Sequence, residues 1–362
     1  MKEKSFPYLS QMKHFKFYSK PDLLWLTKPR KYETRIGERI QVLNNHSEEL
    51  FQNIQQQKAR FVLVGIPEDI GVRGNLGIGG TDTSWLPFLQ SFLNIQNNAY
   101  LLGEDILLLG HFDFGDIKYL IENAAYNQDE MVDAFRRAVP IIDDEIEFIA
   151  KQITYAGKIP IFIGGGHNNA YPIIKGVAKG LYRREQVSLA QINCINLDAH
   201  TDYKFTEGRH SGNPFRYAEH DGYLGKYCAI AVHENYIQQN VLSDLEENPF
   251  TQYISFEDIF IREKINFKQA INHAIRFTKD SFIGLELDVD VIENVLSSAF
   301  TPTGISTIDA RRFIHHTATA ARVAYLHICE SASQLVTGKK DDSTGKLLSY
   351  LVSDFCKAIA HP

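Results

Sequence analysis

The sequence predicts a single α/β domain built on a mostly parallel sheet whose two faces are both covered by helices. Short, continuous apolar runs such as residues 60–65 and 159–163 are typical of strands buried on both faces. Amphipathic stretches such as 130–155 and 266–279 alternate with these runs, as helices do in parallel α/β folds. No linker, internal repeat or low-complexity tract interrupts the alternation, so we expect residues 60–362 to form one domain.

The expected elements follow one another from residue 60. Residues 1–59 are mixed and spotted with aromatic side chains, and we expect an N-terminal extension of one or two helices packed on the main domain. The glycine-rich stretch 66–80 lacks the GxGxxG spacing of a dinucleotide-binding loop, and its mixture of charges suggests a loop folded around something small and polar. The expected strands span residues 60–65, 105–109, 159–163, 191–197, 226–232, 252–255, 282–291 and 323–329. The expected helices span residues 85–93, 130–155, 266–279, 306–322 and 347–359.

Charge and composition argue against several classes of partner. The net charge is −6 and no basic block stands out, which argues against nucleic acid or an acidic membrane surface. The N-terminal lysines precede no apolar run, and no segment approaches the roughly 20 apolar residues of a membrane span. The four cysteines lie far apart without a CxxC pair, so we expect neither a disulfide framework nor a zinc-thiolate site. We therefore expect a soluble, cytoplasmic protein that acts on a small molecule.

The motif DAHTD follows the predicted strand 191–197 directly. In parallel sheets, ligands collect beyond the carboxyl ends of the strands. Side chains alternate along a strand, so Asp198, His200 and, if the extended backbone continues, Asp202 would face one way. Taken alone, this motif is about as consistent with a capped strand end as with a metal site.

Two other expected strands also end in ligand-type residues. His167 follows a triple glycine after strand 159–163, while Asp288 and Asp290 alternate near the end of strand 282–291. His167 alone could be an ordinary loop histidine and the aspartates a solvated edge, but two acids within an apolar run repel unless a cation lies between them. Four carboxylates and two imidazoles could hold two divalent metals, and a donor set without thiolate favours manganese over zinc, nickel or iron. Two such ions would activate a bridging hydroxide for hydrolysis.

Three of these motifs resemble the metal signatures of a known family. GGGH at 164–167, DAHTD at 198–202 and LDVD at 287–290 are similar, in order and in wide spacing, to those of the arginase–agmatinase–formimidoylglutamase (ureohydrolase) family. The resemblance runs from about residue 60 to the C-terminus and implies a three-layer α/β/α sandwich with a mostly parallel eight-stranded sheet. It also implies a homo-oligomer with two Mn²⁺ ions per chain. The implied ligands are His167, Asp198, Asp202 and Asp288 for one ion and Asp198, His200, Asp288 and Asp290 for the other.

The same resemblance suggests two residues that act on the substrate. Glu330, directly after strand 323–329, resembles the acid with which the family holds an amidine or guanidine by paired hydrogen bonds. His210, in the loop after DAHTD, is a candidate to carry a proton to the leaving amine. The alternatives are a simple strand-terminal acid and a surface histidine.

Two loops favour one branch of the family. SGNPFR at 211–216 resembles the SGxPFR of formimidoylglutamases more than the SGNxHG of arginases and agmatinases. GVRGNLG at 71–77 resembles the GVRxNxGR of formimidoylglutamases. This implies hydrolysis of N-formimidoyl-L-glutamate to L-glutamate and formamide, a step of histidine degradation, by a metal-bridging hydroxide. The candidate substrate contacts are Arg73, Asn75, Ser211, Asn213 and Arg216.

Other functions stay open at this point. An agmatinase- or arginase-type hydrolase that releases urea from a guanidino group is one alternative. A catalytically silent relative kept for binding or assembly is another, because the chain departs from the family pattern after LDVD, at Val291–Asn294, and after Glu330, at Ser331–Ser333. The further departures at Ile78 and Asn168 loosen the substrate assignment.

Overall fold

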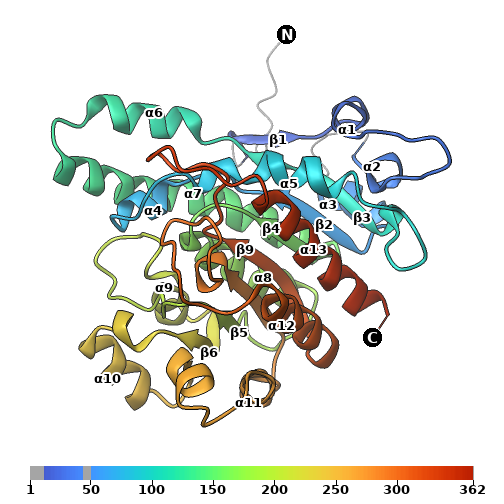
Figure 1. Cartoon of the computed structure of the whole chain (residues 1–362). Coiled ribbons are helices and arrows are strands. Elements are labelled where there is room, and N and C mark those ends of the chain that lie inside the picture. Colours follow the sequence, from blue (N-terminus) through green and yellow to red (C-terminus); the bar gives the residue numbers. More distant parts are fainter. Residues whose placement is uncertain (1–11, 44–49, 362) are drawn as a thin grey trace.

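The computed structural model describes residues 12–43 and 50–361, which form a nine-stranded sheet between two layers of helices (Figure 1). The strand order is β1-β3-β2-β4-β9-β8-β5-β6-β7, and every pair is parallel except the antiparallel pair β1 and β3. The predicted fold class and its eight parallel strands are therefore confirmed. The strands are β1 (Phe15–Phe17), β2 (Phe61–Gly65), β3 (Ile106–Phe112), β4 (Ile159–Ile163), β5 (Ile192–Leu197), β6 (Leu224–Val232), β7 (Thr251–Ser255), β8 (Ile283–Asp288) and β9 (Val323–Cys329).

Helices cover both faces of this sheet. The helices are α1 (Lys20–Leu26), α2 (Ile36–Arg39), α3 (Leu50–Gln56), α4 (Ile70–Gly74), α5 (Trp85–Phe92), α6 (Gly115–Ala124), α7 (Gln128–Tyr155), α8 (Ala170–Arg183), α9 (Pro214–His220), α10 (Gln239–Glu247), α11 (Phe267–Thr278), α12 (Thr307–Ala320) and α13 (Thr344–Ala360). Short helical turns are η2 (Thr81–Thr83), η3 (Gly103–Asp105), η4 (His167–Asn169), η5 (Glu234–Tyr236), η6 (Glu257–Ile261) and η7 (Val289–Val291). Within the described ranges, the structure contains no helix long and apolar enough to cross a membrane.

Two hydrophobic cores lie on opposite faces of the sheet, because side chains alternate along each strand. In β2, Phe61 and Leu63 belong to the core formed with α5, α11, α12 and α13. Val62 and Val64 belong to the core formed with α7, α8 and α9. Figure 1 shows α13, in red, beside α5, in cyan, on the first of these faces. This arrangement is the three-layer sandwich that the sequence predicts.

The N-terminal segment contributes a strand as well as helices. We expected helices only, but Phe15–Phe17 pairs with β3 and extends the sheet at one edge. The segment is fastened by His14, whose Nδ1 lies 2.5 Å from Glu145 Oε1 and whose Nε2 lies 3.2 Å from Asp116 Oδ1. A three-residue strand is too short to show a periodicity in the sequence. The parts of the expected extension at 1–11 and 44–49 fall outside the described residues.

Helix α8 was not predicted, because proline and glycine lower the helix propensity of its sequence. The structure explains the glycines. A Cβ atom added at Gly176 would lie 2.5 Å from the carbonyl oxygen of Glu147, in the middle of α7. The absence of a side chain at this position therefore lets α8 pack closely on α7. This contact holds the helix that directly follows His167.

We predict that Phe355→Ala destabilises the fold. Phe355 of α13 is fully buried, and its ring lies edge-on to Phe61 of β2 with the ring centroids 6.0 Å apart. Removing the ring leaves a cavity between helix and sheet, which should lower the free energy of unfolding by about 3–5 kcal/mol. Denaturant unfolding of the metal-free protein measures this value.

The matched control is Phe250→Ala, at a phenylalanine that is 55% exposed. A surface change of this kind should alter stability by less than about 1 kcal/mol. Equal losses for the two variants would contradict the assigned core.

Candidate metal centre and substrate pocket

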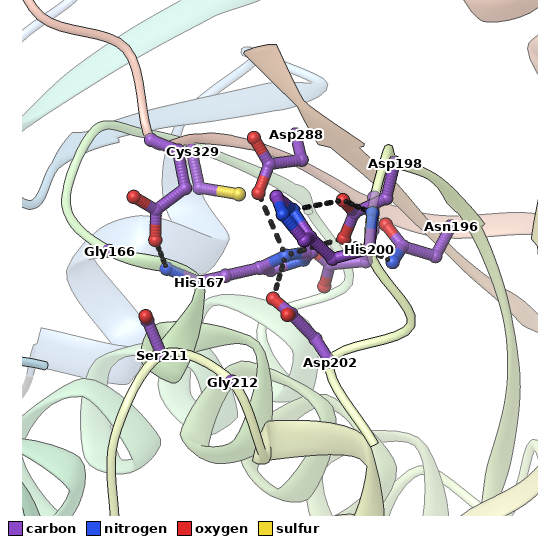
Figure 2. Close-up of polar contacts among 12 residues, drawn as sticks. Gly166, His167, Asn196, Asp198, His200, Asp202, Ser211, Gly212, Asp288 and Cys329 are labelled. Carbon is purple, nitrogen blue, oxygen red and sulfur yellow. Dashed lines mark hydrogen bonds and ion pairs between the residues drawn. The ribbon is translucent and has the colours of Figure 1, made fainter. Parts of the chain in front are cut away.

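The expected ligand residues meet at the carboxyl ends of neighbouring strands in the middle of the sheet. His167 follows β4, Asp198 follows β5, Asp288 ends β8 and Glu330 follows β9, and the order β4-β9-β8-β5 makes these strands consecutive. Parallel strands end at the same edge, so residues far apart in the sequence come within bonding distance of one another. Figure 2 shows the side chains of His167 and three aspartates pointing toward one another.

The first group surrounds the ring of His167. Its Nδ1 lies 3.2 Å from Asp198 Oδ2, 2.8 Å from Asp202 Oδ2 and 3.3 Å from Asp288 Oδ2. These four residues each offer a ligand atom, and the four atoms lie within 4.8 Å of one another. Their arrangement is suited to one cation.

The second group shares Asp198 with the first. His200 Nδ1 lies 3.1 Å from Asp290 Oδ2 and 3.6 Å from Asp198 Oδ1. Ligand atoms of these three residues also lie within 4.8 Å of one another, whereas Asp288 is grouped with His167. Asp198 is thus the residue common to both groups.

Tight turns, rather than continued strands, bring these residues together. We expected a strand through Asp290, and this was wrong, because β8 ends at Asp288. Strand β5 ends at Leu197, as predicted, and the extended backbone does not continue to Asp202. After each strand an aspartate caps the turn with its own side chain: Asp198 Oδ1 accepts the backbone N–H of His200 at 2.6 Å, and Asp288 Oδ1 accepts that of Asp290 at 2.8 Å.

The donor chemistry of both groups fits hard divalent cations. Asp198, Asp288 and Asp290 are 0, 1 and 3% exposed, and Asp290 Oδ1 has no hydrogen-bond donor among the described residues. Burial, together with the charges of Asp290 and Asp198, raises the pKa of Asp288 well above its ordinary value. Burial opposes a charge on His167, but the carboxylates of Asp198, Asp202 and Asp288 beside its ring hold the pKa of the imidazole well above the ordinary value. Carboxylate and imidazole ligands of this kind suit Mn²⁺.

Glu286, a further buried acid, lies at the Nε2 side of the His167 ring. Glu286 Oε2 lies 3.5 Å from His167 Nε2 and 2.6 Å from His327 Nδ1, while Oε1 accepts the hydroxyl of Tyr325 at 2.5 Å. Burial raises the pKa of Glu286, but His327 and His167 outweigh it and lower the value to about 2. The carboxylate of Glu286 thus faces Nε2, while Nδ1 faces the three aspartates. Histidines that bind metals commonly have an acid beside the ring nitrogen that is not a ligand. Sequence reasoning missed Glu286; an acid two residues before Asp288 in an apolar strand was the available signal.

Cys329 also lies beside His167. Ligand atoms of His167, His327 and Cys329 come within 4.8 Å of one another, and all three residues are buried. Burial raises the pKa of the Cys329 thiol well above its ordinary value, which favours the neutral form. The four cysteines are free and buried.

Glu330 is held in a fixed orientation. Its backbone φ of +59° is left-handed, a conformation that a non-glycine residue adopts mainly where the surroundings impose it. Oε1 accepts the backbone N–H of His167 at 2.7 Å, and Oε2 accepts the hydroxyl of Ser298. Burial raises the pKa of Glu330 to about 8, although both hydrogen bonds lower it.

Glu68 connects the loop after β2, in which it lies, with the glycine loop that contains His167. Its Oε1 accepts the backbone N–H of Gly166 at 2.8 Å and the amide of Asn169 at 2.7 Å, and its Oε2 accepts the N–H of Ile70 at 2.6 Å. Burial raises the pKa of this carboxyl to about 7. Glu68 therefore fixes the glycine loop against the start of α4.

A cavity of about 120 Å³ lies over this centre. Its lining includes His200 and four acids, Asp202, Asp288, Asp290 and Glu330. From the surrounding loops it includes Asn75, Lys204, Ser211, Tyr236 and Ser298. Asn75 and Ser211 were predicted as substrate contacts, whereas sequence reasoning missed Lys204, Tyr236 and Ser298. For Lys204 the signal was its place two residues after Asp202.

The two predicted arginines lie outside this lining. Arg73 forms an ion pair with Glu122, and its guanidinium lies 4.5 Å from the ring centre of Phe135. Arg216 forms an ion pair with Asp244 and stacks on Tyr203.

His210 and Asn213 are fully buried in the loop instead of lining the cavity. His210 Nδ1 accepts the N–H of Gly212 at 3.1 Å, while Asn213 Nδ2 donates to the carbonyl oxygens of Phe205 and Gly208 at 3.0 and 2.8 Å. Burial lowers the pKa of His210 to about 3, and nearby cations add to this effect. Both side chains serve to hold the loop in shape.

A buried ion pair fixes this loop to α7. Arg209 is 5% exposed and donates from Nε and Nη2 to the two carboxylate oxygens of Asp143 at 2.9 and 3.2 Å. The same Nη2 donates to the carbonyl oxygen of Asn168 at 2.7 Å, and the guanidinium lies over the rings of Tyr171 and Tyr217. Arg209 therefore connects Asn168, the residue after His167, with α7 and with the loop that contains SGNPFR.

The sequence matches a known family and a named relative. The model of the arginase family matches residues 59–356. A formimidoylglutamase from Psychrobacter cryohalolentis is 33% identical over 216 residues, which cover 56% of this chain and 59% of that protein. The chain thus spans about three fifths of the length of this relative.

Solved structures share the fold. Formimidoylglutamase from Bacillus subtilis superposes with a TM-score of 0.69 at 16% identity, covering 92% of this chain and 94% of that one. Trypanosoma cruzi formiminoglutamase, solved with Mn²⁺, superposes with a TM-score of 0.67 at 17% identity, covering 91% of this chain and 99% of that one.

We predict that Arg209→Met destabilises the protein strongly. The substitution leaves Asp143 buried without its cation, and breaking a buried pair in this way should lower the free energy of unfolding by about 3–5 kcal/mol. Replacing both partners, as Arg209→Met with Asp143→Leu, should recover much of this loss. Chemical denaturation compares these variants.

Arg312→Met, at an arginine whose side chain is 70% exposed, is the control. A loss no larger for Arg209→Met than for this control would show that the buried pair does not hold the loop.

Proposed function

Because the chain belongs to the arginase family, we propose that it hydrolyses the amidine carbon–nitrogen bond of N-formimidoyl-L-glutamate. Water adds to the amidine carbon and the bond to the substituted nitrogen breaks, which gives L-glutamate and formamide. The single observation that carries this proposal is the convergence of two ligand groups beside one cavity, whose lining includes members of both groups and Glu330. Relatives named formimidoylglutamase support the choice of substrate.

The metal centre of this proposal uses the two groups described above. One Mn²⁺ would be held by His167, Asp198, Asp202 and Asp288 and the other by Asp198, His200 and Asp290, with Asp288 as the further bridge that the sequence predicts. When bound, such ions supply the positive charge that makes water nucleophilic at neutral pH.

The chain's own residues would position the amidine. Glu330 is held at Oε1 by the N–H of His167 and at Oε2 by Ser298, so the plane of its carboxylate is fixed before substrate enters. A planar amidinium cation can pair with such a carboxylate through two hydrogen bonds. His210 remains the sequence-based candidate for protonating the leaving amine, and its place outside the cavity lining gives that role no support.

A substrate panel tests the proposal. Manganese-loaded protein is assayed with N-formimidoyl-L-glutamate, arginine, agmatine and guanidinobutyrate. Preferred turnover of the first is expected. Preference for arginine or agmatine would overturn the substrate, and no turnover of any amidine or guanidine would favour a silent relative.

We predict that Asp198→Asn removes most of the metal and nearly all of the activity. Asp198 is the residue common to both groups, so its loss weakens both positions. Activity should fall by about 1,000-fold, which corresponds to about 4 kcal/mol of transition-state stabilisation. Elemental analysis after dialysis counts the ions retained. Two ions still bound by the variant would contradict the shared assignment.

We predict that Glu330→Gln separates substrate binding from metal binding. The amide keeps the shape of the side chain but cannot become the carboxylate that pairs with an amidinium ion. The metal content should stay that of the unmodified protein, while kcat/KM should fall by about 100-fold. Asp129→Asn, on the exposed first turn of α7, is the control and should change neither quantity. Loss of metal in Glu330→Gln would contradict the assigned role.

A further inference from the structure

We propose that a groove beside α13 binds a small organic phosphate that carries a planar ring, as a nucleoside diphosphate does. The groove lies between α13, α12 and the loop that follows α5. On this face of the sheet, α13 packs between α5 and α12 (Figure 1). The groove shares no lining residue with the cavity over the metal centre. It therefore stands apart from the site of amidine hydrolysis proposed above.

The lining of the groove is positively charged. Its volume is about 300 Å³, and its charged lining residues are Arg311, Lys346 and Lys357. Among the residues that the structure describes, no aspartate or glutamate belongs to this lining. The chain as a whole has a net charge of −6, so three cations without an acid are unusual for its surface. A concave site lined by one sign of charge attracts ligands of the opposite sign.

Two of these cations have no acid as a partner. The ammonium groups of Lys346 and Lys357 form no ion pair with any part of the chain that the structure describes. Arg311 donates from Nε and Nη2 to the carboxylate of Asp354 at 2.6 and 3.2 Å. This pair orients the guanidinium and leaves its Nη1 for another acceptor. Phosphate oxygens are strong acceptors for such donors.

The three cations are spread along the groove. Lys346 and Lys357 are eleven residues apart on α13, a rise of about 16 Å along the helix axis. Arg311 contacts α13 between them, because its guanidinium lies 4.6 Å from the ring centre of Tyr350. A ligand with several negative groups can contact more than one of these cations at once. The spacing therefore favours a polyanion over a single small anion.

Aromatic and apolar side chains line the same groove. The side chains of Tyr100 and Tyr350 are exposed, and Ile95 and Leu101 lie beside them in the lining. A planar ring that packs on aromatic side chains buries area on both partners, and the bases of nucleotides commonly do so. Cations and exposed rings in one groove thus suit a phosphate group attached to a planar ring.

The walls of the groove are held in shape by the fold. Backbone hydrogen bonds join Asn98 and Leu101 in both directions, at 3.1 and 3.0 Å, and Asn98 Oδ1 accepts the N–H of Tyr100 at 3.0 Å. On the side of α13, a Cβ atom added at Gly345 would lie 2.4 Å from the carbonyl oxygen of Pro87. The glycine therefore lets α13 begin close to α5. A preformed groove loses little conformational freedom when a ligand binds.

Titration calorimetry on the full chain tests this site with ADP, pyrophosphate and adenosine. We expect one ADP per chain, bound about 10-fold or more tightly than pyrophosphate, because only ADP offers a ring to the tyrosines. Adenosine, which has no phosphate, should bind about 10-fold or more weakly than ADP.

Variants of the two unpaired lysines locate the bound ligand. Lys346→Met and Lys357→Met should each weaken ADP binding by about 10-fold or more, because each removes a cation that contacts phosphate. Lys58→Met, at an exposed lysine, and Lys204→Met, in the lining of the other cavity, are the controls and should leave ADP binding unchanged.

The outcomes that contradict this site are specific. Absence of ADP binding, or equal binding by the unmodified protein and both lysine variants of α13, would overturn the site. Loss of ADP binding in Lys204→Met alone would place the ligand in the other cavity and overturn it as well. Equal affinities for ADP and pyrophosphate would overturn the part assigned to the tyrosines. None of these results depends on turnover of an amidine.

Discussion

Repulsion among buried carboxylates is the constraint on which the rest of the structure depends. Asp198, Asp288 and Asp290 are almost fully buried within a few ångströms of one another, and each would be unstable there as an isolated anion. Two imidazoles and two backbone N–H groups compensate part of this charge. Divalent cations are the natural complement of the remainder. The centre of the sheet provides such a place, because four consecutive strands end there.

A second set of buried acids keeps this arrangement rigid. Glu68, Glu286 and Asp143 each lie outside the ligand groups and each has its own donors. Glu68 fixes the glycine loop, Glu286 lies beside Nε2 of His167, and Asp143 holds Arg209 and with it the loop that contains SGNPFR. Each acid is satisfied by groups from a different segment, so the segments cannot shift independently. The site is thereby assembled by the fold itself, as precise ligand geometry requires.

The sequence predicts the strands and the ligand set better than the loops. All eight parallel strands are located from the sequence. Strands β4 and β9 match to the residue, because their burial on both faces leaves a continuous apolar run. The ligand motifs stand out because each follows its own strand. Helix α8 is missed because the glycine that lowers its propensity, Gly176, is explained only by contact with α7. The turns after Asp198 and Asp288 are missed for a similar reason: side-chain capping, not periodicity, sets them.

Charged residues in the loops are the hardest to interpret from sequence, since the availability of a charge depends on partners that only the fold reveals. Arg73 and Arg216 look like substrate contacts, yet each is already paired with an acid. Lys204 has an ordinary sequence context, yet it faces the cavity with an amide oxygen as its partner. The strand ends therefore bring the candidate ligands together, whereas partners within the fold decide which loop cations are left free of an acid. A chain of this fold can thus keep its acids and change its specificity by changing which loop cation is neutralised.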